Sequence, residues 1–197
     1  MISLLPGTLC FRNAVAADSP ITVIQRFCDV LVAVMRDAAR LSFDQRYQRL
    51  APAITQTYNL PLMSQLAVGG AWVRLQPAQQ QRLSDDFSRY TIAVYANRFD
   101  SYNGQRFEVE PGGVSNPSGV IVQSRLIRTD GTKLVLNYLM RQNSGGLWQA
   151  IDVYLSGTIS ELATRRADFA AVLQRSGVDG LLQLLEARTA DLRLNKS

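Results

Sequence analysis

Few residues of this chain could carry out chemistry. The 197-residue sequence contains no histidine and only two cysteines, Cys10 and Cys28. Without histidine there is no Ser-His-Asp triad, no Cys-His pair and no histidine-ligated zinc, and two cysteines are too few for a four-cysteine zinc site. The sequence also has no phosphate-binding glycine loop, no serine elbow and no metal-ligand spacing. Any acid–base chemistry would therefore depend on Asp, Glu, Lys, Tyr or Cys.

Asp152 is the one candidate for a proton-transfer residue. It lies inside a β-rich run, and we expect Tyr138 and Tyr154 beside it. Because curved-sheet α+β folds can hold a buried Asp with a Tyr, one hypothesis is a small-molecule enzyme that uses Asp152 with a tyrosine. The alternative, which we favour, is a structural salt bridge from Asp152 to Arg128 or Arg141.

Cys28 lies on the apolar stripe of a helix. Ser19 followed by Pro20 is typical of a helix start, with a capping side chain and a proline in the first turn. Apolar residues then recur at helical spacing: Ile24, Phe27, Cys28, Leu31, Val34 and Met35. The position indicates a buried free thiol rather than a nucleophile.

The charge of the chain is basic but dispersed. There are 21 Lys and Arg against 16 Asp and Glu, a formal net charge of +5, and the sequence pI is about 9.6. Only Lys133 and Lys196 are lysines, so nearly all of the positive charge is arginine, and arginines alternate with aspartates. Nucleic-acid binding proteins gather such residues into a patch, so we do not expect a nucleic-acid partner. The pattern favours solvated helix faces with mild attraction to acidic partners, including anionic lipid headgroups.

The first 17 residues resemble a secretory leader. An apolar stretch, residues 2–11, precedes Ala14-Val15-Ala16, which has the small-x-small form of a cleavage site. No basic region precedes the apolar stretch, and Arg12 interrupts its end. We expect residues 1–17 to be a signal peptide or its remnant and residues 18–197 to form a single domain. No other segment is long and apolar enough to span a membrane.

Further helices are indicated downstream of the first one. Ser42 and Gln45 form a capping box that opens a second helix, and Pro52 should kink or divide it. A broad apolar surface on the helix that starts at Gln76-Pro77 predicts burial on more than one side. The remaining helices are expected at residues 61–68, 76 to about 102–104, 159–174 and 178–190, the last two separated at Ser176-Gly177.

After residue 104 the apolar period changes from 3.6 to 2, which is typical of strands. Asp130-Gly131 is a hairpin signal, and residues 143–146 form another turn. We expect four antiparallel strands, at residues 105–110, 120–128, 133–141 and 147–155. The order of elements predicts an α+β fold with helices packed on one face of a curved four-stranded antiparallel sheet.

One face of the expected sheet is apolar. On the third expected strand this face carries Leu134, Leu136, Tyr138 and Met140. The second strand contributes Val120, Val122 and Leu126, interrupted by Ser124, and the fourth contributes Ile151, Val153 and Leu155. Such a face is consistent with a plain core under the helices. For any single residue this core is the better interpretation, and the functional alternative is an apolar cavity between sheet and helices.

Five segments in order resemble one family. Residues 58–72 have a short helix, a small-residue turn and a tryptophan, as the family does, and residues 75–87 resemble its "T-P-E-Q…F…F" helix. Residues 95–104 resemble its "Y-A-x-x-x-x-x-Y-x-G" helix end, and residues 148–157 its "W-K-V-x-D-V-x-V-x-G" strand. Residues 163–177 resemble its "Y-R-x-Q-F-x-x-x-L-x-x-x-G" helix. In the last, Arg166, Phe169, Leu173 and Gly177 match, whereas Arg165 replaces the Tyr and Asp168 the Gln. The chain resembles the MlaC family, also called the toluene-tolerance auxiliary family, and residues 98–102 look closest to its hopanoid-associated branch, HpnM.

The resemblance implies a monomeric, soluble periplasmic lipid carrier that has no catalytic residues and binds lipid rather than a cofactor. Such a carrier has a nuclear-transport-factor-like lobe, holds phospholipid or hopanoid acyl chains in an apolar cavity, and leaves headgroups near solvent. It would exchange lipid between an inner-membrane transporter component and an outer-membrane acceptor, with transient contact at the membrane surface. From the expected faces we predict that these residues line the cavity: Val34, Met63, Leu66, Tyr95, Phe99, Val120, Val122, Leu134, Leu136, Tyr138, Ile151, Val153, Phe169 and Leu173.

Overall fold

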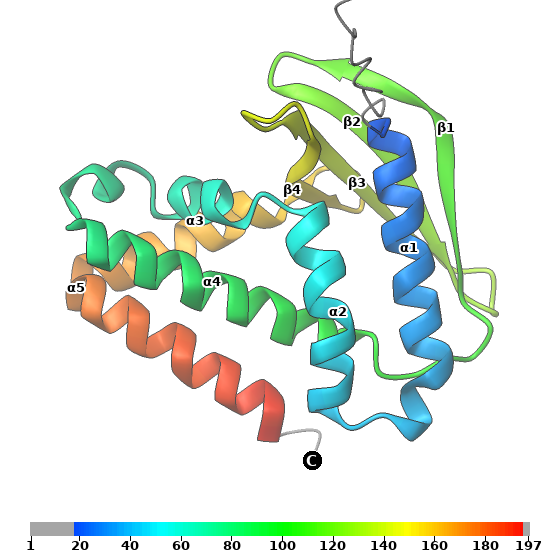
Figure 1. The fold of residues 1–197 in the computed structure, drawn as a ribbon, viewed down its shortest axis with the longest axis horizontal. Helices are drawn as coiled ribbons and strands as arrows, with labels where there is room; N and C mark the ends of the chain where they lie inside the picture. The colour runs from blue at the N-terminus through cyan, green and yellow to red at the C-terminus, as the bar shows by residue number, and fades with distance from the viewer. Residues whose placement is uncertain (1–17, 195–197) are drawn as a thin grey trace, which may run out of the picture.

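The fold was obtained as a computed structural model that describes residues 18–194 (Figure 1). The leader-like segment 1–17 lies outside the described residues. The elements are, in order, α1 (Pro20–Asp37), a 3-10 turn (Ala38–Arg40), α2 (Phe43–Thr57), α3 (Leu60–Val68), a 3-10 turn (Gly69–Arg74), α4 (Pro77–Arg98), β1 (Arg106–Asn116), β2 (Gly119–Ile127), β3 (Lys133–Gln142), β4 (Trp148–Leu155), β5 (Ile159–Ser160) and α5 (Glu161–Leu194).

The two predicted N-terminal caps are present at the starts of α1 and α2. The Ser19 hydroxyl accepts a hydrogen bond from the Thr22 backbone N–H at 3.1 Å, one turn into α1. Ser42 and Gln45 form the reciprocal capping box of α2, with hydrogen bonds of 2.9 and 3.2 Å. We predicted that Pro52 kinks or divides this helix, and the structure excludes a division, because α2 passes through Pro52 as a single element.

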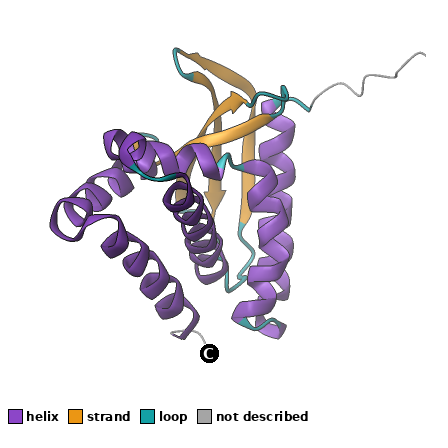
Figure 2. Ribbon diagram, turned by 60° about the vertical axis from the view of Figure 1, so that its left-hand side comes forward, coloured by secondary structure: helices purple, strands orange, loops and turns teal. Residues whose placement is uncertain are grey.

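Helix α4 is buried on several sides, as its broad apolar surface predicted. It packs against α2, α3 and α5 (Figures 1 and 2). It ends at Arg98, earlier than the predicted 102–104, because Phe99 leaves the helical conformation with φ −105° and ψ 56°. The residues after it cross to β1 as a loop.

The predicted break at Ser176-Gly177 is a sharp bend within α5. Gly177 has φ 65° and ψ −167°, a left-handed conformation that residues with a Cβ rarely adopt. After the bend the second half of α5 runs back alongside α4 (Figure 1). The helix starts at Glu161 rather than at residue 159, and it continues to Leu194.

Within residues 18–194 the sheet has five strands, so the prediction of four was wrong. All neighbours are antiparallel, in the order β1-β2-β3-β4-β5. The fifth strand, Ile159–Ser160, is two residues long and is too short to show a period of two. β1 is longer than predicted because a register shift between Val109 and Gly113 carries it past Pro111 and on to Asn116.

A second register shift alters the face of β4. Leu139 pairs with Asp152 and Met140 pairs with Ala150, so Ile151 is the extra residue of a bulge. Ala150 and Val153 therefore both join the core, whereas the uninterrupted alternation that we expected put Ala150 on the opposite side from Val153. The predicted face is correct for Val153 and Leu155 and wrong for Ile151.

The helices and the inner face of the sheet enclose one apolar core. α1 crosses the sheet beside β1, and α2 lies between α1 and the group formed by α3, α4 and α5 (Figures 1 and 2). Phe27, Tyr58 and Tyr138 are among its largest fully buried side chains. The α+β class is as predicted, and none of the helices in residues 18–194 is long and apolar enough to cross a membrane.

Candidate functional site

An apolar cavity of about 210 Å³ lies between the inner face of the sheet and helices α3, α4 and α5, and we call it the sheet–helix cavity. β2, β3 and β4 form one wall, and the C-terminal half of α4 and the first turns of α5 form the other. Its lining residues are Tyr58, Met63, Thr91, Val94, Tyr95, Arg98, Phe99, Leu126, Leu134, Leu136, Val153, Leu155, Glu161, Leu162 and Arg165.

The sheet side of the cavity is built from cross-strand pairs of aliphatic residues. Leu126 of β2 pairs with Leu134 of β3, and Leu136 of β3 pairs with Leu155 of β4. Ser124, which interrupts this face, donates a hydrogen bond from its hydroxyl to the Leu136 carbonyl at 2.7 Å. This polar side chain on the inner face of β2 is thus satisfied by the backbone, and the wall is apolar.

Tyrosines form the floor of the cavity. The hydroxyl groups of Tyr58 and Tyr95 are hydrogen bonded to each other, and the ring of Tyr95 stacks on Phe99 with centroids 5.5 Å apart. Tyr138 lies behind Tyr58, with 6.4 Å between ring centroids. Burial raises the pKa of Tyr95 to about 12 and raises the pKa values of Tyr58 and Tyr138 well above their ordinary value.

The charged residues of the lining are Arg98, Glu161 and Arg165. Arg165, on the first turns of α5, donates a hydrogen bond from Nη1 to the Thr91 hydroxyl at 3.2 Å. Its guanidinium lies over the rings of Phe87 and Tyr90 on α4, at 5.3 and 5.2 Å from their centroids. The cavity therefore has an aliphatic wall, an aromatic floor and a charged end.

Six residues that we predicted to line a cavity are brought together here: Met63, Tyr95, Phe99, Leu134, Leu136 and Val153. The other eight lie elsewhere. The apolar core contains Val34, Val122, Tyr138 and Phe169, and the bulge buries Ile151. Leu66 and Val120 are partly buried outside the lining. Leu173 lines a separate groove between α5 and the turn after α3.

Sequence reasoning missed nine lining residues: Tyr58, Thr91, Val94, Arg98, Leu126, Leu155, Glu161, Leu162 and Arg165. Leu126 and Leu155 continue the apolar alternation of β2 and β4, so that signal was present in the sequence. Arg98, Glu161 and Arg165 could not be found by a search for apolar faces, because their charge excluded them.

Asp152 does not lie on this cavity, and its predicted salt bridge to Arg128 or Arg141 was wrong. Its side chain is 6% exposed, and Oδ2 accepts a hydrogen bond from the Ser160 hydroxyl at 2.5 Å. Oδ1 accepts from the backbone N–H groups of Val153 and Leu162 at 2.7 and 3.0 Å. The hydrogen bonds of Asp152 thus connect β4 to β5 and to the first turn of α5.

The tyrosines named with Asp152 are divided between the two faces of the sheet. Tyr138 pairs with Val153 and points into the core, whereas Leu139 is the residue opposite Asp152. Tyr154 is only partly buried, and burial, with a smaller contribution from the Asp152 charge, raises its pKa. The geometry favours a structural role for Asp152.

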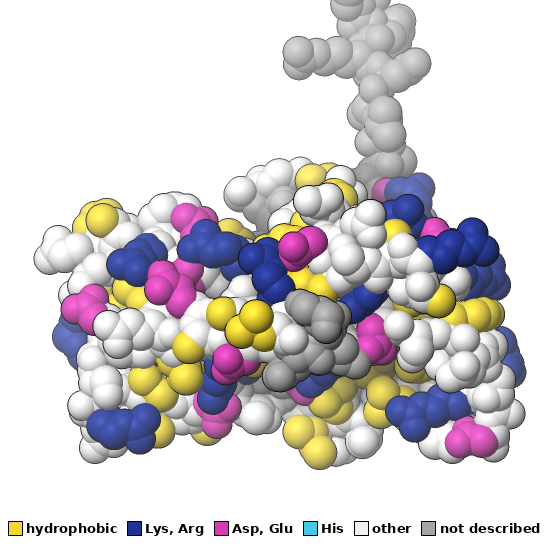
Figure 3. Space-filling model, turned by 90° about the horizontal axis from the view of Figure 1, so that it is seen from below, with side chains coloured by type: hydrophobic (Ala, Val, Ile, Leu, Met, Phe, Trp, Pro, Cys, Tyr) yellow, Lys and Arg dark blue, Asp and Glu magenta, His cyan; other side chains and the backbone are white. Residues whose placement is uncertain are grey.

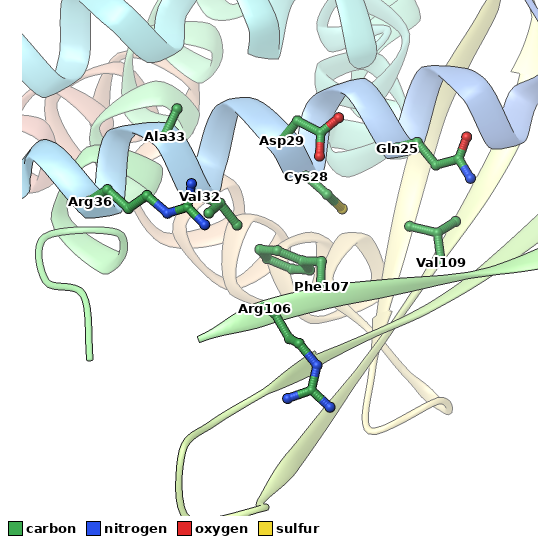
Figure 4. Close-up of a pocket in the computed structure, with 9 residues that line it drawn as sticks. All are labelled: Gln25, Cys28, Asp29, Val32, Ala33, Arg36, Arg106, Phe107 and Val109. Atoms are coloured by element: carbon green, nitrogen blue, oxygen red, sulfur yellow. The ribbon is translucent and has the colours of Figure 1, made fainter. Parts of the chain in front are cut away.

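A second groove, of about 440 Å³, lies between α1 and β1 (Figure 4). In Figure 4, Phe107 points from β1 toward α1, and Cys28 points from α1 toward β1, whereas Arg106 points away. Cys28 is free and 3% exposed, and burial, with a smaller contribution from Asp29, raises its pKa to about 12. This thiol is a buried core group, as the helical stripe predicted, and the groove around it is much more polar than the sheet–helix cavity.

Charges on the face shown in Figure 3 are dispersed rather than gathered. Figure 3 shows Lys and Arg side chains interspersed with Asp and Glu across one face of the molecule. Ion pairs such as Arg82–Glu186 and Arg193–Asp44, both 2.8 Å, join these groups between elements. On this face there is no continuous basic stripe of the kind that binds nucleic acid.

The fold and the cavity define an α+β domain in which helices and an antiparallel sheet enclose an apolar chamber. The chain belongs to the MlaC protein family, whose model matches residues 25–187. The assignment to the hopanoid-associated branch stays a prediction.

The proteins similar to this chain include a curated protein and a protein of solved structure. It is 30% identical over 104 residues to the toluene tolerance protein Ttg2D of Pseudomonas putida, a match that spans 52% of this chain and 47% of that protein. It also resembles the structure of a phospholipid-binding protein from Ralstonia solanacearum in complex with a phospholipid, with a TM-score of 0.76 and 25% identity, covering 89% of this chain and 99% of that one.

Proposed function

We propose that this protein is a periplasmic phospholipid carrier that holds acyl chains in the sheet–helix cavity. The observation that carries the proposal is the lining of that cavity, in which aliphatic residues from β2, β3 and β4 face apolar and aromatic residues of α3 and α4. The phospholipid in the complex of the Ralstonia solanacearum protein, which has the same fold, supports the choice of ligand. The six predicted residues on the lining remain candidates for lipid contact.

The energetics favour such a cavity for holding lipid without any covalent step. Each methylene group removed from water contributes about 0.8 kcal/mol, so burial of acyl chains in an apolar cavity gives a large favourable binding free energy. Ligand pockets usually measure about 300–1,000 Å³. The sheet–helix cavity, at about 210 Å³, is smaller than this range, so a two-chain lipid needs more room than the cavity offers in this structure.

The carrier would act between membranes. We propose that it accepts lipid from, or delivers it to, an inner-membrane transporter component and an outer-membrane acceptor, and that it touches membrane surfaces transiently as a monomer. The dispersed arginines suit this role, because they attract anionic surfaces without the tight binding that a concentrated basic patch would give. A hopanoid is the second candidate ligand, since residues 98–102 resemble the hopanoid-associated branch.

A vesicle transfer assay tests this function. Donor vesicles would contain a labelled phospholipid or a labelled hopanoid, and unlabelled acceptor vesicles would be separated from them after incubation with the protein. We expect the rate of phospholipid transfer to rise in proportion to protein concentration. If the protein accelerated transfer of the hopanoid alone, the ligand would be a hopanoid and not a phospholipid. If it accelerated transfer of neither lipid, the result would contradict a carrier function.

A further inference from the structure

Arg165 is a partly buried cation at the charged end of the sheet–helix cavity. Burial lowers its pKa, which reflects the cost of removing the guanidinium from water. Among the residues that the structure describes, no ion pair includes Arg165, although it lies within the electrostatic reach of Glu161. Removing a cation even partly from water without pairing it to a carboxylate is costly, so the position of Arg165 at a cavity needs a reason.

The contacts of Arg165 fix the guanidinium plane and leave most of its donors unused. The rings of Phe87 and Tyr90 lie against the group, and Thr91 accepts one hydrogen bond. A guanidinium carries five N–H donors in a planar fork that matches two oxygens of a phosphate. Stacking on aromatic rings holds this fork in place at little entropic cost to a later ligand.

Arg98 adds a second positive charge at the same end of the cavity. It lines the cavity from the last turn of α4, and its charge is one of the influences that lower the pKa of Arg165. The two cations therefore repel each other, and an anion between them would relieve that repulsion. Among the described residues that line the cavity, Arg98 and Arg165 are basic and Glu161 alone is acidic, so their summed charge is positive.

We propose that Arg165, assisted by Arg98, binds the phosphate group of the lipid, so that the cavity selects phosphate-bearing lipids over uncharged lipids of the same acyl chains. This inference rests on the proposed carrier function and adds a headgroup site to it. It also favours a phospholipid over a hopanoid that lacks phosphate.

Binding of paired lipids tests the proposal. Delipidated protein would be titrated with dioleoylphosphatidylglycerol and with dioleoylglycerol, which has the same chains and no phosphate, and each would displace a fluorescent acyl probe. We expect wild-type protein to bind the phospholipid about 10- to 100-fold more tightly, the range that charge-assisted hydrogen bonds supply. The Arg165→Gln variant should lose most of that preference while its affinity for dioleoylglycerol changes little.

Further variants distinguish a headgroup-binding role of Arg165 from a structural role in packing α5 against α4. Arg165→Lys keeps the charge and should retain part of the preference, whereas Arg165→Tyr should abolish it. Arg166→Gln is the matched control, because it removes a positive charge one residue along the chain. The Arg166 side chain lines the separate groove between α5 and the turn after α3, so this variant should leave the affinities for both lipids unchanged. Equal weakening of both lipids by Arg165→Gln would overturn the proposal, because it would show a purely structural role.

Two other outcomes also overturn it. Equal affinity of wild-type protein for the two lipids would contradict selection by the headgroup while leaving the carrier function intact. Inorganic phosphate alone, if it bound at micromolar concentration and Arg165→Gln removed that binding, would make this a site for free phosphate rather than for a lipid. Binding of neither lipid would instead be a failure of the proposed carrier function itself, and the headgroup site would fall with it.

Discussion

The hydroxyl groups of Tyr58 and Tyr95 share a hydrogen bond at the floor of the sheet–helix cavity. Tyr58 follows the last residue of α2, and Tyr95 lies in the last turn of α4, so the bond joins two helices that are distant in sequence. The ring of Phe27 lies against both tyrosines, with centroids 5.5 and 5.6 Å away. This aromatic cluster joins the core beneath α1 to the cavity beneath α4.

The tyrosine cluster should make the fold sensitive to alkaline pH. Because the pKa of Tyr95 is raised to about 12, its stabilising effect is complete below pH ~10 and is lost as pH rises from about 10 toward 12. The Tyr95→Phe variant lacks this ionisation, so its free energy of unfolding should fall less steeply over that range in urea titrations. Tyr102→Phe, outside the cluster and beneath the Arg36 guanidinium, is the control. Equal slopes for wild type and Tyr95→Phe would contradict the assignment.

Cys28 should be inert in the folded protein. Its thiol is buried and its pKa is raised to about 12, so almost no thiolate exists at neutral pH. We expect iodoacetamide to leave the peptide that contains Cys28 unmodified until denaturant is added, as measured by mass spectrometry. Rapid alkylation under native conditions would show that α1 separates from β1 far more readily than this packing implies.

Asp152 should contribute to stability and not to lipid binding. The Asp152→Asn variant replaces a carboxylate oxygen that accepts hydrogen bonds with an amide, and it should lower the free energy of unfolding by about 1–3 kcal/mol. Asp168→Asn, on the exposed side of α5, should change it much less. Loss of bound lipid from Asp152→Asn at a temperature where it stays folded would give this residue a functional role after all.

Gly177 should be required for the bend of α5. Its φ of 65° disfavours any residue with a Cβ, while a Cβ added there would meet no atom within 4 Å. Gly177→Ala should therefore destabilise through the backbone alone, by about 1–2 kcal/mol. Gly70→Ala, also in open space but without a positive φ, should be close to neutral. A neutral Gly177→Ala would mean that the two halves of α5 tolerate another geometry.

Local signals predicted much of the fold, and long-range pairing produced the errors. The capping box of Ser42 with Gln45 and the break at Gly177 involve neighbours in sequence, so both were visible without a structure. β5 forms only because Ile159 and Ser160 pair with the end of β4. The bulge at Ile151 depends on the register between β3 and β4, so alternation along β4 alone misplaced this residue.

The candidate cavity was predictable only in its apolar part. Leu134, Leu136 and Val153 share a face that period-two alternation identifies, and the cavity lies against it. The charged end requires α4 and α5 to be placed side by side, which brings Arg165 against Phe87 and Tyr90 across more than 70 residues of sequence. No local pattern encodes that contact.

The central claim is that the sheet–helix cavity holds the acyl chains of a phospholipid, and adjacent residues of β3 test it most directly. Leu134 lines the cavity, while Val135 lines a groove on the opposite face of the sheet, and both are partly buried. Organic extracts of purified wild type, Leu134→Trp and Val135→Trp would be analysed by mass spectrometry for phospholipid per folded chain. We predict stoichiometric phospholipid in wild type and Val135→Trp and little in Leu134→Trp. Absence of phospholipid from wild type, or equal amounts in all three proteins, would contradict the account.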